Sequence, residues 1–122
     1  MRLRPGQHLR RNADFGAVRE QGRRVDCRAF LLTWRVRPAP AAGPARVGVV
    51  ASRAAVGDAV RRNRAKRRLR EIYRKHQNLV PPNLDLVLTA RAALLRLEFS
   101  EVEARFTSAC RKLVPPAAPT HG

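Results

Sequence analysis

Asp58-Ala-Val-Arg-Arg-Asn-Arg-Ala-Lys-Arg-Arg-Leu-Arg-Glu-Ile-Tyr-Arg-Lys-His-Gln77 has the composition and spacing of one long helix. Asp58 is a good N-cap residue, because its carboxylate can accept hydrogen bonds from the first amide groups of a helix, which have no partner inside it. No Gly or Pro interrupts the chain over residues 59–80, and Pro81-Pro82 then ends the helix. The sequence therefore predicts a helix that covers residues 59–80.

This predicted helix has an apolar side and a cationic side. At about 100° per residue, its apolar residues fall within one sector about 100° wide, which is the width that a core-facing stripe needs. They are Ala65, Leu69, Ile72 and Tyr73, joined by His76. The opposite side carries Asn63, Arg64, Arg67, Arg70, Arg74 and Lys75, with Arg62 and Lys66 toward one flank. We therefore expect the helix to dock through its apolar stripe and to present a row of cations outward.

The charge of the helix is far from balanced. Over residues 58–77, nine Lys and Arg side chains face only Asp58 and Glu71, which leaves a net charge of +7. Like charges three and four residues apart repel by a few tenths of a kcal/mol per pair, so an ordinary solvated face mixes both signs. A polyanion would relieve this repulsion, and the planar group of arginine suits phosphate well. A nucleic acid is therefore favoured over a plain solvated face, and over a membrane surface, which needs a broad apolar face.

The composition of the whole chain fits one small basic domain. Its 122 residues suffice for one hydrophobic core and leave no room for a second. The apolar fraction is 44% and the aromatic fraction only 5%, so the interior must be built mainly from Val, Leu, Ala and Ile. The formal net charge of +17 makes a polyanion the leading kind of partner. No stretch has the character of a signal or membrane segment, and we expect a soluble, cytoplasmic protein.

Upstream of the basic helix, the sequence predicts a short helix and two strands. Asn12 can cap a helix over residues 13–20, and Gly22 stands where a glycine commonly stops one. Alternation over Phe30-Leu-Leu-Thr-Trp-Arg-Val36 indicates a strand with one buried face, and Arg46-Val-Gly-Val-Val-Ala51 indicates a second strand. The Pro-rich segment between them is a loop. An antiparallel hairpin of these two strands is the simplest pairing.

Downstream, the sequence predicts a strand, a helix and a free tail. Leu84-Asp-Leu-Val-Leu-Thr-Ala90 is mostly apolar and suits a strand buried on both faces. Ser100-x-x-Glu103 is a capping box that would open a last helix. The apolar positions of that helix are Val102, Phe106, Ala109, Cys110 and Leu113. Residues 115–122 have nothing to bury, so we expect a disordered tail. Together the elements predict an α+β domain with a small mixed or antiparallel sheet.

Neither the histidines nor the acidic residues form a pattern for catalysis by the protein itself. His8, His76 and His121 belong to separate parts of the chain, which leaves no acid and base pair built on histidine. The aspartates are dispersed, whereas a metal site needs clustered carboxylates. Cys27 and Cys110 lack the spacing of a zinc or redox site and are expected to be buried free thiols. We therefore predict no catalytic residue and no metal site on the chain.

The most specific feature is the order of residues at the start of the basic helix. Val56-Gly-Asp-Ala-Val60 is followed by Arg62-Asn-Arg-Ala-Lys-Arg-Arg-Leu-Arg70. This resembles the Arg-Asn-Arg signature of the bacterial ribonuclease P protein family, whose members join a catalytic RNA to remove 5′ leaders from precursor tRNA. The resemblance continues from Leu9-Arg-Arg-Asn-Ala-Asp-Phe15 through Arg46-Val-Gly48 to Asp85-Leu-Val-Leu-Thr-Ala-Arg91. It covers nearly all of residues 8–113.

The resemblance implies a particular fold. It is a single compact α+β domain of the ribosomal-S5-domain-2-like type, with the element order αβββαβα. The basic helix lies in a left-handed βαβ crossover, an exception to the usual handedness. A short strand around Arg23–Asp26 supplies the additional β element, and the domain covers residues 1–114, ahead of the tail at 115–122.

The resemblance also implies where RNA is bound. In the family, the RNA carries out hydrolysis with Mg²⁺, which the RNA subunit mainly holds, so the chain is expected to be the protein component of a ribonucleoprotein endoribonuclease. The residues that match the family's site for the catalytic RNA are Arg53, Arg62, Asn63, Arg64, Lys66, Arg67 and Arg70. The segment Ser52-Arg-Ala-Ala55 is one residue longer and one cation poorer than in the family, which predicts a local bulge.

A second surface, a cleft between the first helix and the sheet, holds the single-stranded leader in the family. Phe15 matches an aromatic residue of this cleft, whereas Arg19 and Thr33 stand where the family often has further aromatic residues. Because each stacked base contributes about 1–3 kcal/mol, a cleft with fewer rings should rely more on charge. The residues alone leave open whether Phe15 lines the cleft or pins the first helix to the sheet.

Two other classes of protein share the charge and the small size. One is a structural RNA-binding protein of the ribosomal type, without a role in processing, and the other is a nonspecific DNA-binding module. Neither explains the spacing of Arg62, Asn63 and Arg64. The expected partners are therefore the ribonuclease P RNA and precursor tRNA, with no membrane and no obligate protein partner.

Overall fold

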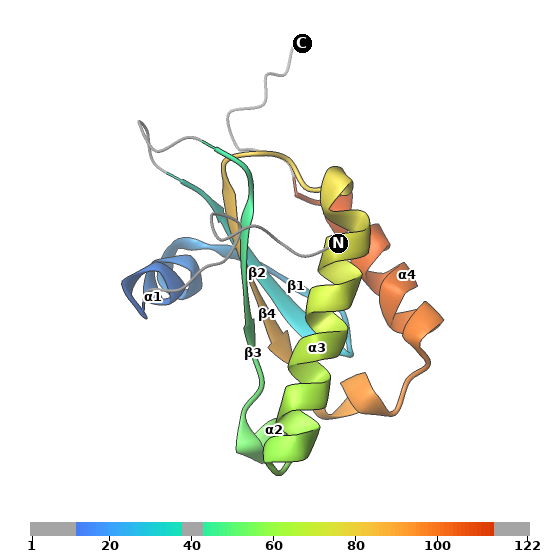
Figure 1. Cartoon of the computed structure of the whole chain (residues 1–122). Coiled ribbons are helices and arrows are strands. Elements are labelled where there is room, and N and C mark those ends of the chain that lie inside the picture. Colours follow the sequence, from blue (N-terminus) through green and yellow to red (C-terminus); the bar gives the residue numbers. More distant parts are fainter. Residues whose placement is uncertain (1–11, 38–42, 114–122) are drawn as a thin grey trace.

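The structure is a computed structural model that describes residues 12–37 and 43–113 (Figure 1). In chain order its elements, with η for a 3-10 helix, are α1 (Asn12–Gln21), β1 (Arg23–Asp26), β2 (Phe30–Val36), β3 (Arg46–Val50), α2 (Arg53–Val56), α3 (Ala59–His76), η2 (Gln77–Leu79), β4 (Leu84–Ala90), η3 (Ala92–Leu95) and α4 (Phe99–Cys110). They form a single α+β domain and confirm the expected order αβββαβα, to which α2 is a short addition. The predicted tail and the limits of the domain lie outside the described residues.

The four strands pair in the order β1-β2-β4-β3. Strand β2 is antiparallel to both β1 and β4, whereas β3 is parallel to β4. The predicted hairpin of β2 and β3 is therefore wrong, because β4 lies between them. The physical reason is burial: β4 is apolar and buried along nearly its whole length, which suits a central strand covered on both faces.

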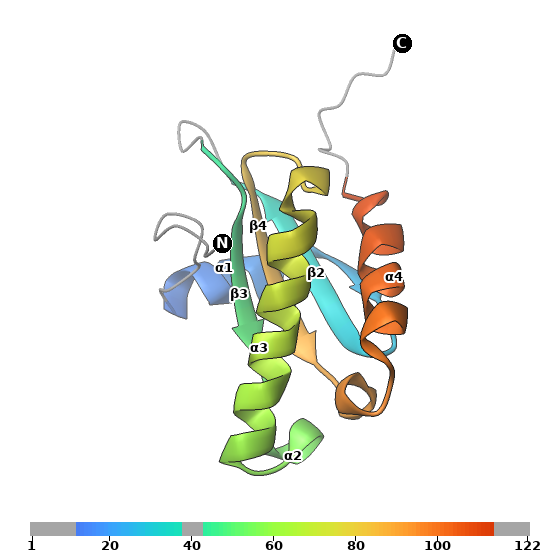
Figure 2. The same cartoon turned by 45° about the vertical axis from the view of Figure 1, so that its right-hand side comes forward.

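The connection from β3 to β4 passes through α2 and α3 and is left-handed. In Figure 2, α3 lies in front of the sheet, both strands run downward, and β4 lies to the right of β3. If the view is turned in its plane until both strands point upward, α3 is still in front and β4 lies to the left of β3. A right-handed crossover would place β4 to the right of β3. The crossover that the family resemblance implied is confirmed, and it lays α3 along one face of the sheet.

The sheet separates two clusters of buried side chains. Helices α3 and α4 cover one face, and α1 covers the other (Figures 1 and 2). The larger cluster, under α3 and α4, includes Phe30, Leu32, Leu69, Ile72, Tyr73, Leu86, Leu88 and Phe106. The smaller cluster joins Val18 of α1 to Val87 of β4, with Phe15 and Val50 packed against it. Helix α1 is thus held to the sheet by far fewer apolar side chains than α3.

Helix α3 confirms the predicted cap and apolar stripe but ends earlier than expected. The Asp58 carboxylate accepts a hydrogen bond from the Arg61 amide at 3.0 Å. The buried residues of the helix are Ala65, Leu69, Ile72 and Tyr73. The α-helix ends at His76, and Gln77–Leu79 forms a 3-10 turn ahead of the two prolines. Helix ends often tighten in this way, because their last carbonyl groups lack partners in the next turn.

Helix α4 begins at Phe99, so the predicted capping box of Ser100 and Glu103 is wrong. The Phe99 ring packs against α3, with Lys75 Nζ 5.3 Å from its centroid. The Glu103 carboxylate also binds α3 and lies 2.8 Å from His76 Nε2 and 3.0 Å from Lys75 Nζ. Hydrogen bonds from His76 and Lys75 lower the pKa of Glu103. Contacts with α3 therefore fix the start of α4.

Helix α1 ends at Gln21, because the chain must then pass very close to β2. The Gly22 amide donates to the Val18 carbonyl at 2.8 Å. A Cβ atom at Gly22 would lie 2.3 Å from the Val18 carbonyl oxygen and 2.6 Å from the Trp34 carbonyl oxygen. Such contacts are too short for any side chain, so glycine is required here by packing.

Both cysteines are buried and free, as the sequence predicted. Burial raises the pKa of Cys27 to about 11 and the pKa of Cys110 to about 12. The thiolate is the reactive form of cysteine, so both side chains are kept in the unreactive thiol form at neutral pH.

A buried ion cluster ties β3 and β2 to β4, the strand that lies between them. Asp85 of β4 is 0% exposed, and Arg46 of β3 donates to each of its carboxylate oxygens at 2.8 Å. Arg35 Nη2, from β2, lies 3.5 Å from the same carboxylate, and Nη1 of Arg37, the residue after β2, lies 3.7 Å from it. Three guanidinium groups therefore surround one carboxylate on the face of the sheet that α1 covers.

Candidate nucleic-acid interface

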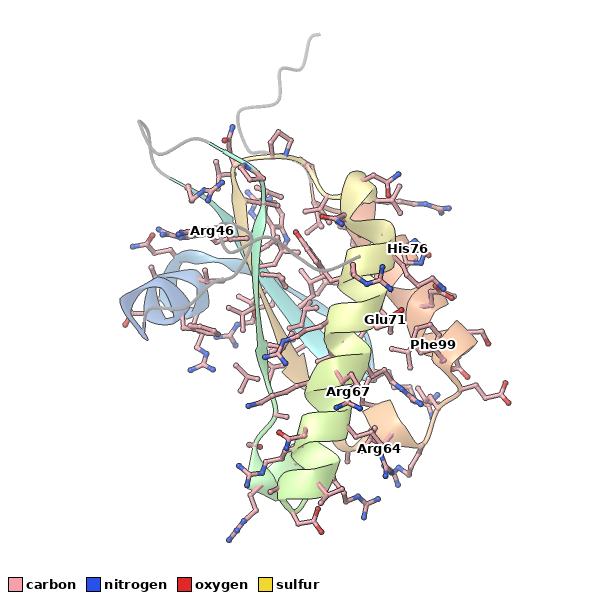
Figure 3. All side chains as sticks on the ribbon, in the orientation of Figure 1. Arg46, Arg64, Arg67, Glu71, His76 and Phe99 are labelled. Atoms are coloured by element: carbon pink, nitrogen blue, oxygen red, sulfur yellow. The ribbon has the colours of Figure 1, made fainter. Side chains whose placement is uncertain are left out.

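The exposed side of α3 carries Asn63, Arg64, Arg67 and Arg70, a row that we call the α3 ridge. Figure 3 shows Arg64 and Arg67 in succession along the lower half of the helix. The opposite side of the same helix is the buried apolar stripe. The fold itself therefore turns the ridge toward solvent.

Three other cations of α3 are engaged within the protein. Arg68 Nη1 donates to two carbonyl groups in the segment before α4, at 2.8 and 3.0 Å. Arg74 pairs with Glu71, and Lys75 pairs with Glu103. Periodicity placed Arg74 and Lys75 on the outward row, but these ion pairs with nearby carboxylates make them less available to a ligand.

The side chains of the remaining α3 cations have no hydrogen-bond or ion-pair partner in residues 12–37 and 43–113. They are Arg61, Arg62, Arg64, Lys66, Arg67 and Arg70. Arg62 is half-buried, and its Nε is shielded from solvent without a partner. Cations crowded on one helix repel one another, so an anion bound here would stabilise the helix as well as the complex.

The chain enters α3 through a short helix where the sequence predicted a bulge. Ser52 Oγ accepts a hydrogen bond from the Ala55 amide at 3.1 Å and caps α2, whose first residue, Arg53, is exposed. Gly57 then has a φ of 117°, which glycine adopts without strain. A Cβ atom at Gly57 would lie 3.1 Å from Arg61 Cδ. Sequence analysis did not select Arg61, although its place in the first turn of the basic helix was a signal.

A hollow of about 430 Å³ between α1, β3 and α3 forms a second surface, which we call the α1 hollow. Its lining residues are Phe15, Gly16, Arg19, Val49, Val50, Ala51 and Lys66. Phe15 is half-buried, packs against the small cluster of Val18 and Val87, and also borders the hollow. Phe15 therefore helps to hold α1 to the sheet and is also open to this hollow, whereas its role in binding the leader stays a prediction. Arg19 and Lys66 bring positive charge to this hollow from two different helices.

The structure also places two further residues that the family resemblance assigned to a site, Thr33 and Lys66. Thr33, expected in the leader cleft, is 3% exposed and does not line the α1 hollow. It is covered at the end of α1, where its Cγ2 would lie 3.1 Å from a Cβ atom on Gly22. Lys66 also lines the α1 hollow, and its expected contact with the catalytic RNA stays a prediction.

The described residues offer no site for a metal ion. No group of three or more His, Cys, Asp or Glu side chains lies together within 12–37 and 43–113. None of the described helices combines the length and the apolar character that a membrane span requires.

Comparison with known proteins points to one family. The family model for Ribonuclease P matches residues 3–114. The ribonuclease P protein component of Desulfovibrio desulfuricans is 38% identical over 107 residues, which cover 86% of this chain and 81% of the relative. That of Thermobifida fusca is 36% identical over 119 residues, which cover 93% of this chain and 80% of the relative. The solved structure of the RNase P protein from Thermotoga maritima has a TM-score of 0.72 at 27% identity, with 93% of this chain and 98% of that chain covered. By the family match and by these relatives, the chain belongs to the ribonuclease P protein family.

Proposed function

We propose that the chain is the protein component of a ribonuclease P ribonucleoprotein, which removes the 5′ leader of precursor tRNA, with the catalytic centre on its RNA subunit. The observation that carries this proposal is the α3 ridge, together with the cations beside it that lack partners in the described chain. In this role the ridge binds backbone phosphates of the catalytic RNA. Arg53 and Arg62 extend the same surface. A cytoplasmic location and the absence of an obligate protein partner stay predictions from the sequence.

The protein contributes electrostatics and positioning to the reaction. Two RNAs, the catalytic strand and the substrate, must come into contact, and their phosphates repel unless cations intervene. With a net charge of +17, the chain can supply those cations. Mg²⁺, held by the RNA, supplies the hydrolytic chemistry when bound, and the protein side chains bind and orient the two RNAs.

The α1 hollow is the proposed site for the single-stranded leader. Phe15 offers one aromatic ring there, and Arg19 and Lys66 offer positive charge. A base stacked on Phe15 would leave its flanking phosphates near these two cations. The hollow therefore suits single-stranded RNA, because a base within a duplex has no open face to stack.

Replacing Phe15 with Ala is expected to weaken the affinity for precursor tRNA and to leave the affinity for mature tRNA unchanged. Loss of one stacked base should cost about 1–3 kcal/mol. Because Phe15 also packs against Val18, Phe15→Leu serves as the second variant: it keeps an apolar side chain but removes the ring. Equilibrium binding of the holoenzyme to both tRNAs measures the effect. Equal losses for precursor and mature tRNA, in a Leu variant that folds normally, would remove Phe15 from the leader site.

Adding the protein to a ribonuclease P RNA is expected to lower sharply the Mg²⁺ concentration needed for cleavage of precursor tRNA. High Mg²⁺ should partly replace the protein, because both screen the same repulsion between phosphates. The measurement is a cleavage series over Mg²⁺ for the RNA alone, the protein alone and the mixture.

The same series separates the proposal from its rivals. A ribosomal or DNA-binding protein of equal charge should not restore site-specific cleavage at low Mg²⁺. Cleavage by protein freed of RNA would place catalysis on the chain, against the absence of an acid and base pair in its sequence. An unchanged Mg²⁺ requirement in the mixture would contradict the electrostatic role.

A further inference from the structure

Arg28, in the tight turn between β1 and β2, has a backbone φ of 66°. This left-handed region favours glycine, because the Cβ atom of any other residue crowds the backbone there. The other described residues with a positive φ are Gly43, Gly57 and Asn83. Asparagine tolerates this conformation, and the Asn83 side chain also accepts a hydrogen bond from the Gly43 amide at 2.8 Å. Within this group, Arg28 is therefore the residue whose side chain does not suit its backbone.

Hydrogen bonds from two strands hold the Arg28 turn in place. Asp26 Oδ1, at the end of β1, accepts from the Arg28 amide at 2.8 Å. The Ala29 carbonyl accepts from the amide of Arg91, the residue after β4, at 3.0 Å. The surroundings therefore impose the strained conformation on Arg28. Glycine at this position would keep both of these hydrogen bonds and would relieve the crowding.

The side chain of Arg28 takes no part in holding this turn. It is exposed, and its guanidinium has no hydrogen-bond or ion-pair partner within residues 12–37 and 43–113. Backbone strain of this kind gathers at functional sites, where the side chain has a use that offsets the cost in stability. We propose that Arg28 binds a backbone phosphate of the catalytic RNA, an inference that rests on the proposed function.

The charge of Arg28 is not compensated by the carboxylates around the turn. Asp26 binds the Arg28 amide through one oxygen, and its other oxygen lies 3.6 Å from Arg91 Nη2. Glu101 of α4 borders the same hollow as Asp26 and is paired with Arg105 at 3.0 Å. Each of these two carboxylates is thus matched by a cation. The planar guanidinium of Arg28 is left for an anion from outside, and its shape matches the oxygen atoms of a phosphate.

The place of the turn in the fold favours the catalytic RNA over the leader. The turn lies beside η3 and the start of α4 (Figures 1 and 2). Arg91 directly precedes η3, and Arg68 of α3 donates to the carbonyl groups of Leu94 and Leu97 at 2.8 and 3.0 Å. These contacts connect the Arg28 turn to the helix that carries the α3 ridge. The α1 hollow, by contrast, is lined from β3, which forms the opposite edge of the sheet from β1.

Two substitutions that remove the same side chain test this proposal. Arg28→Ala keeps a Cβ atom and with it the crowding, whereas Arg28→Gly releases it. We expect both to weaken binding of the full-length protein to a ribonuclease P RNA roughly tenfold, as for one lost charged hydrogen bond. The Gly variant should nevertheless unfold about 4 °C above the Ala variant, because it alone relieves the strain.

Arg111→Ala is the matched control. Arg111 is exposed and follows α4, so this variant removes one positive charge at the end of α4 that is away from η3. It should weaken binding to the RNA much less than Arg28→Gly does. Filter binding of each variant to the RNA, and thermal unfolding of each free protein, give the two measurements.

Three outcomes would overturn the proposal. Equal losses of affinity in the Arg28 and Arg111 variants would show a general effect of charge. A Gly variant that unfolds below the Ala variant would show that the turn is not strained. An Arg28→Gly holoenzyme that loses affinity for precursor tRNA, while its protein binds the catalytic RNA normally, would assign Arg28 to the substrate. In each case binding of the RNA by the unchanged protein means that only this inference fails; if the unchanged protein does not bind the RNA, the proposed function fails as well.

Discussion

Replacing Asp85 with Asn is expected to lower the free energy of unfolding by roughly 3–5 kcal/mol, the usual cost of removing one partner from a buried ion pair. The variant keeps the shape of the side chain but leaves Arg35, Arg37 and Arg46 around a neutral amide. Their mutual repulsion is then no longer offset in a place where Asp85 is completely buried. Chemical denaturation at neutral pH measures the loss directly.

Asp26→Asn provides the control for this prediction. Asp26 is 64% exposed and lies 3.6 Å from Arg91, so its ion pair is formed at the surface. Exposed pairs contribute at most about 1 kcal/mol, and the Asn side chain keeps an oxygen that can accept from the Arg28 amide. If the two variants lose equal stability, the Asp85 cluster does not hold β2 and β3 to β4.

The pairing of the strands shows where local patterns stop being informative. The sequence predicted each of the two hairpin strands from its alternation, but alternation states only which face is buried and not which strand lies alongside. The apolar character of Leu84–Ala90 on both faces was the available signal, because a strand buried on both sides belongs in the middle of a sheet. The left-handed crossover came only from the family resemblance, since the general rule predicts the opposite hand.

Helix ends could be predicted where neighbouring residues determine them, but not where contacts with another helix do. The Asp58 cap was predictable, because the residues that form it are three positions apart. The capping box at Ser100 was not, because Glu103 binds His76 and Lys75, which lie on another helix. A side chain that binds a residue of another helix is not available to cap its own helix. No local motif reveals such a partner.

Only part of the candidate site could be predicted, because local patterns do not reveal contacts with other elements. The α3 ridge follows from helical periodicity, so Arg64, Arg67 and Arg70 were placed on the exposed side of the helix. Arg74 and Lys75 share that periodicity but are paired with Glu71 and Glu103. Which cations stay open to a ligand therefore depends on tertiary contacts, as does the burial of Thr33 beneath the end of α1.

Replacing Arg64 and Arg67 together with Ala is expected to weaken binding to the ribonuclease P RNA by roughly 100-fold. Each side chain can make a charged hydrogen bond to phosphate, worth about 1.5–3 kcal/mol, and 1.4 kcal/mol is a factor of ten in affinity. Stability should hardly change, because both residues are exposed, alanine favours a helix, and the substitution removes like-charge repulsion. The matched control is Arg96→Ala with Arg111→Ala, which removes the same charge from exposed positions before and after α4.

The salt dependence of binding identifies the physical origin of that loss. If six phosphates are neutralised in the complex, log K should fall against log salt with a slope of roughly −4 to −5, and the double variant should reduce the size of this slope by about 1.5. The control variant carries the same net charge, so a similar change in its slope would mean that the RNA senses only the overall field of the protein. A slope near zero, or a large loss of thermal stability in the Arg64 and Arg67 variant, would show that the α3 ridge is structural. If the slope becomes shallower only in the Arg64 and Arg67 variant, the phosphate contacts are made by the side chains of the α3 ridge. Arg68, Arg74 and Lys75 are already engaged within the protein.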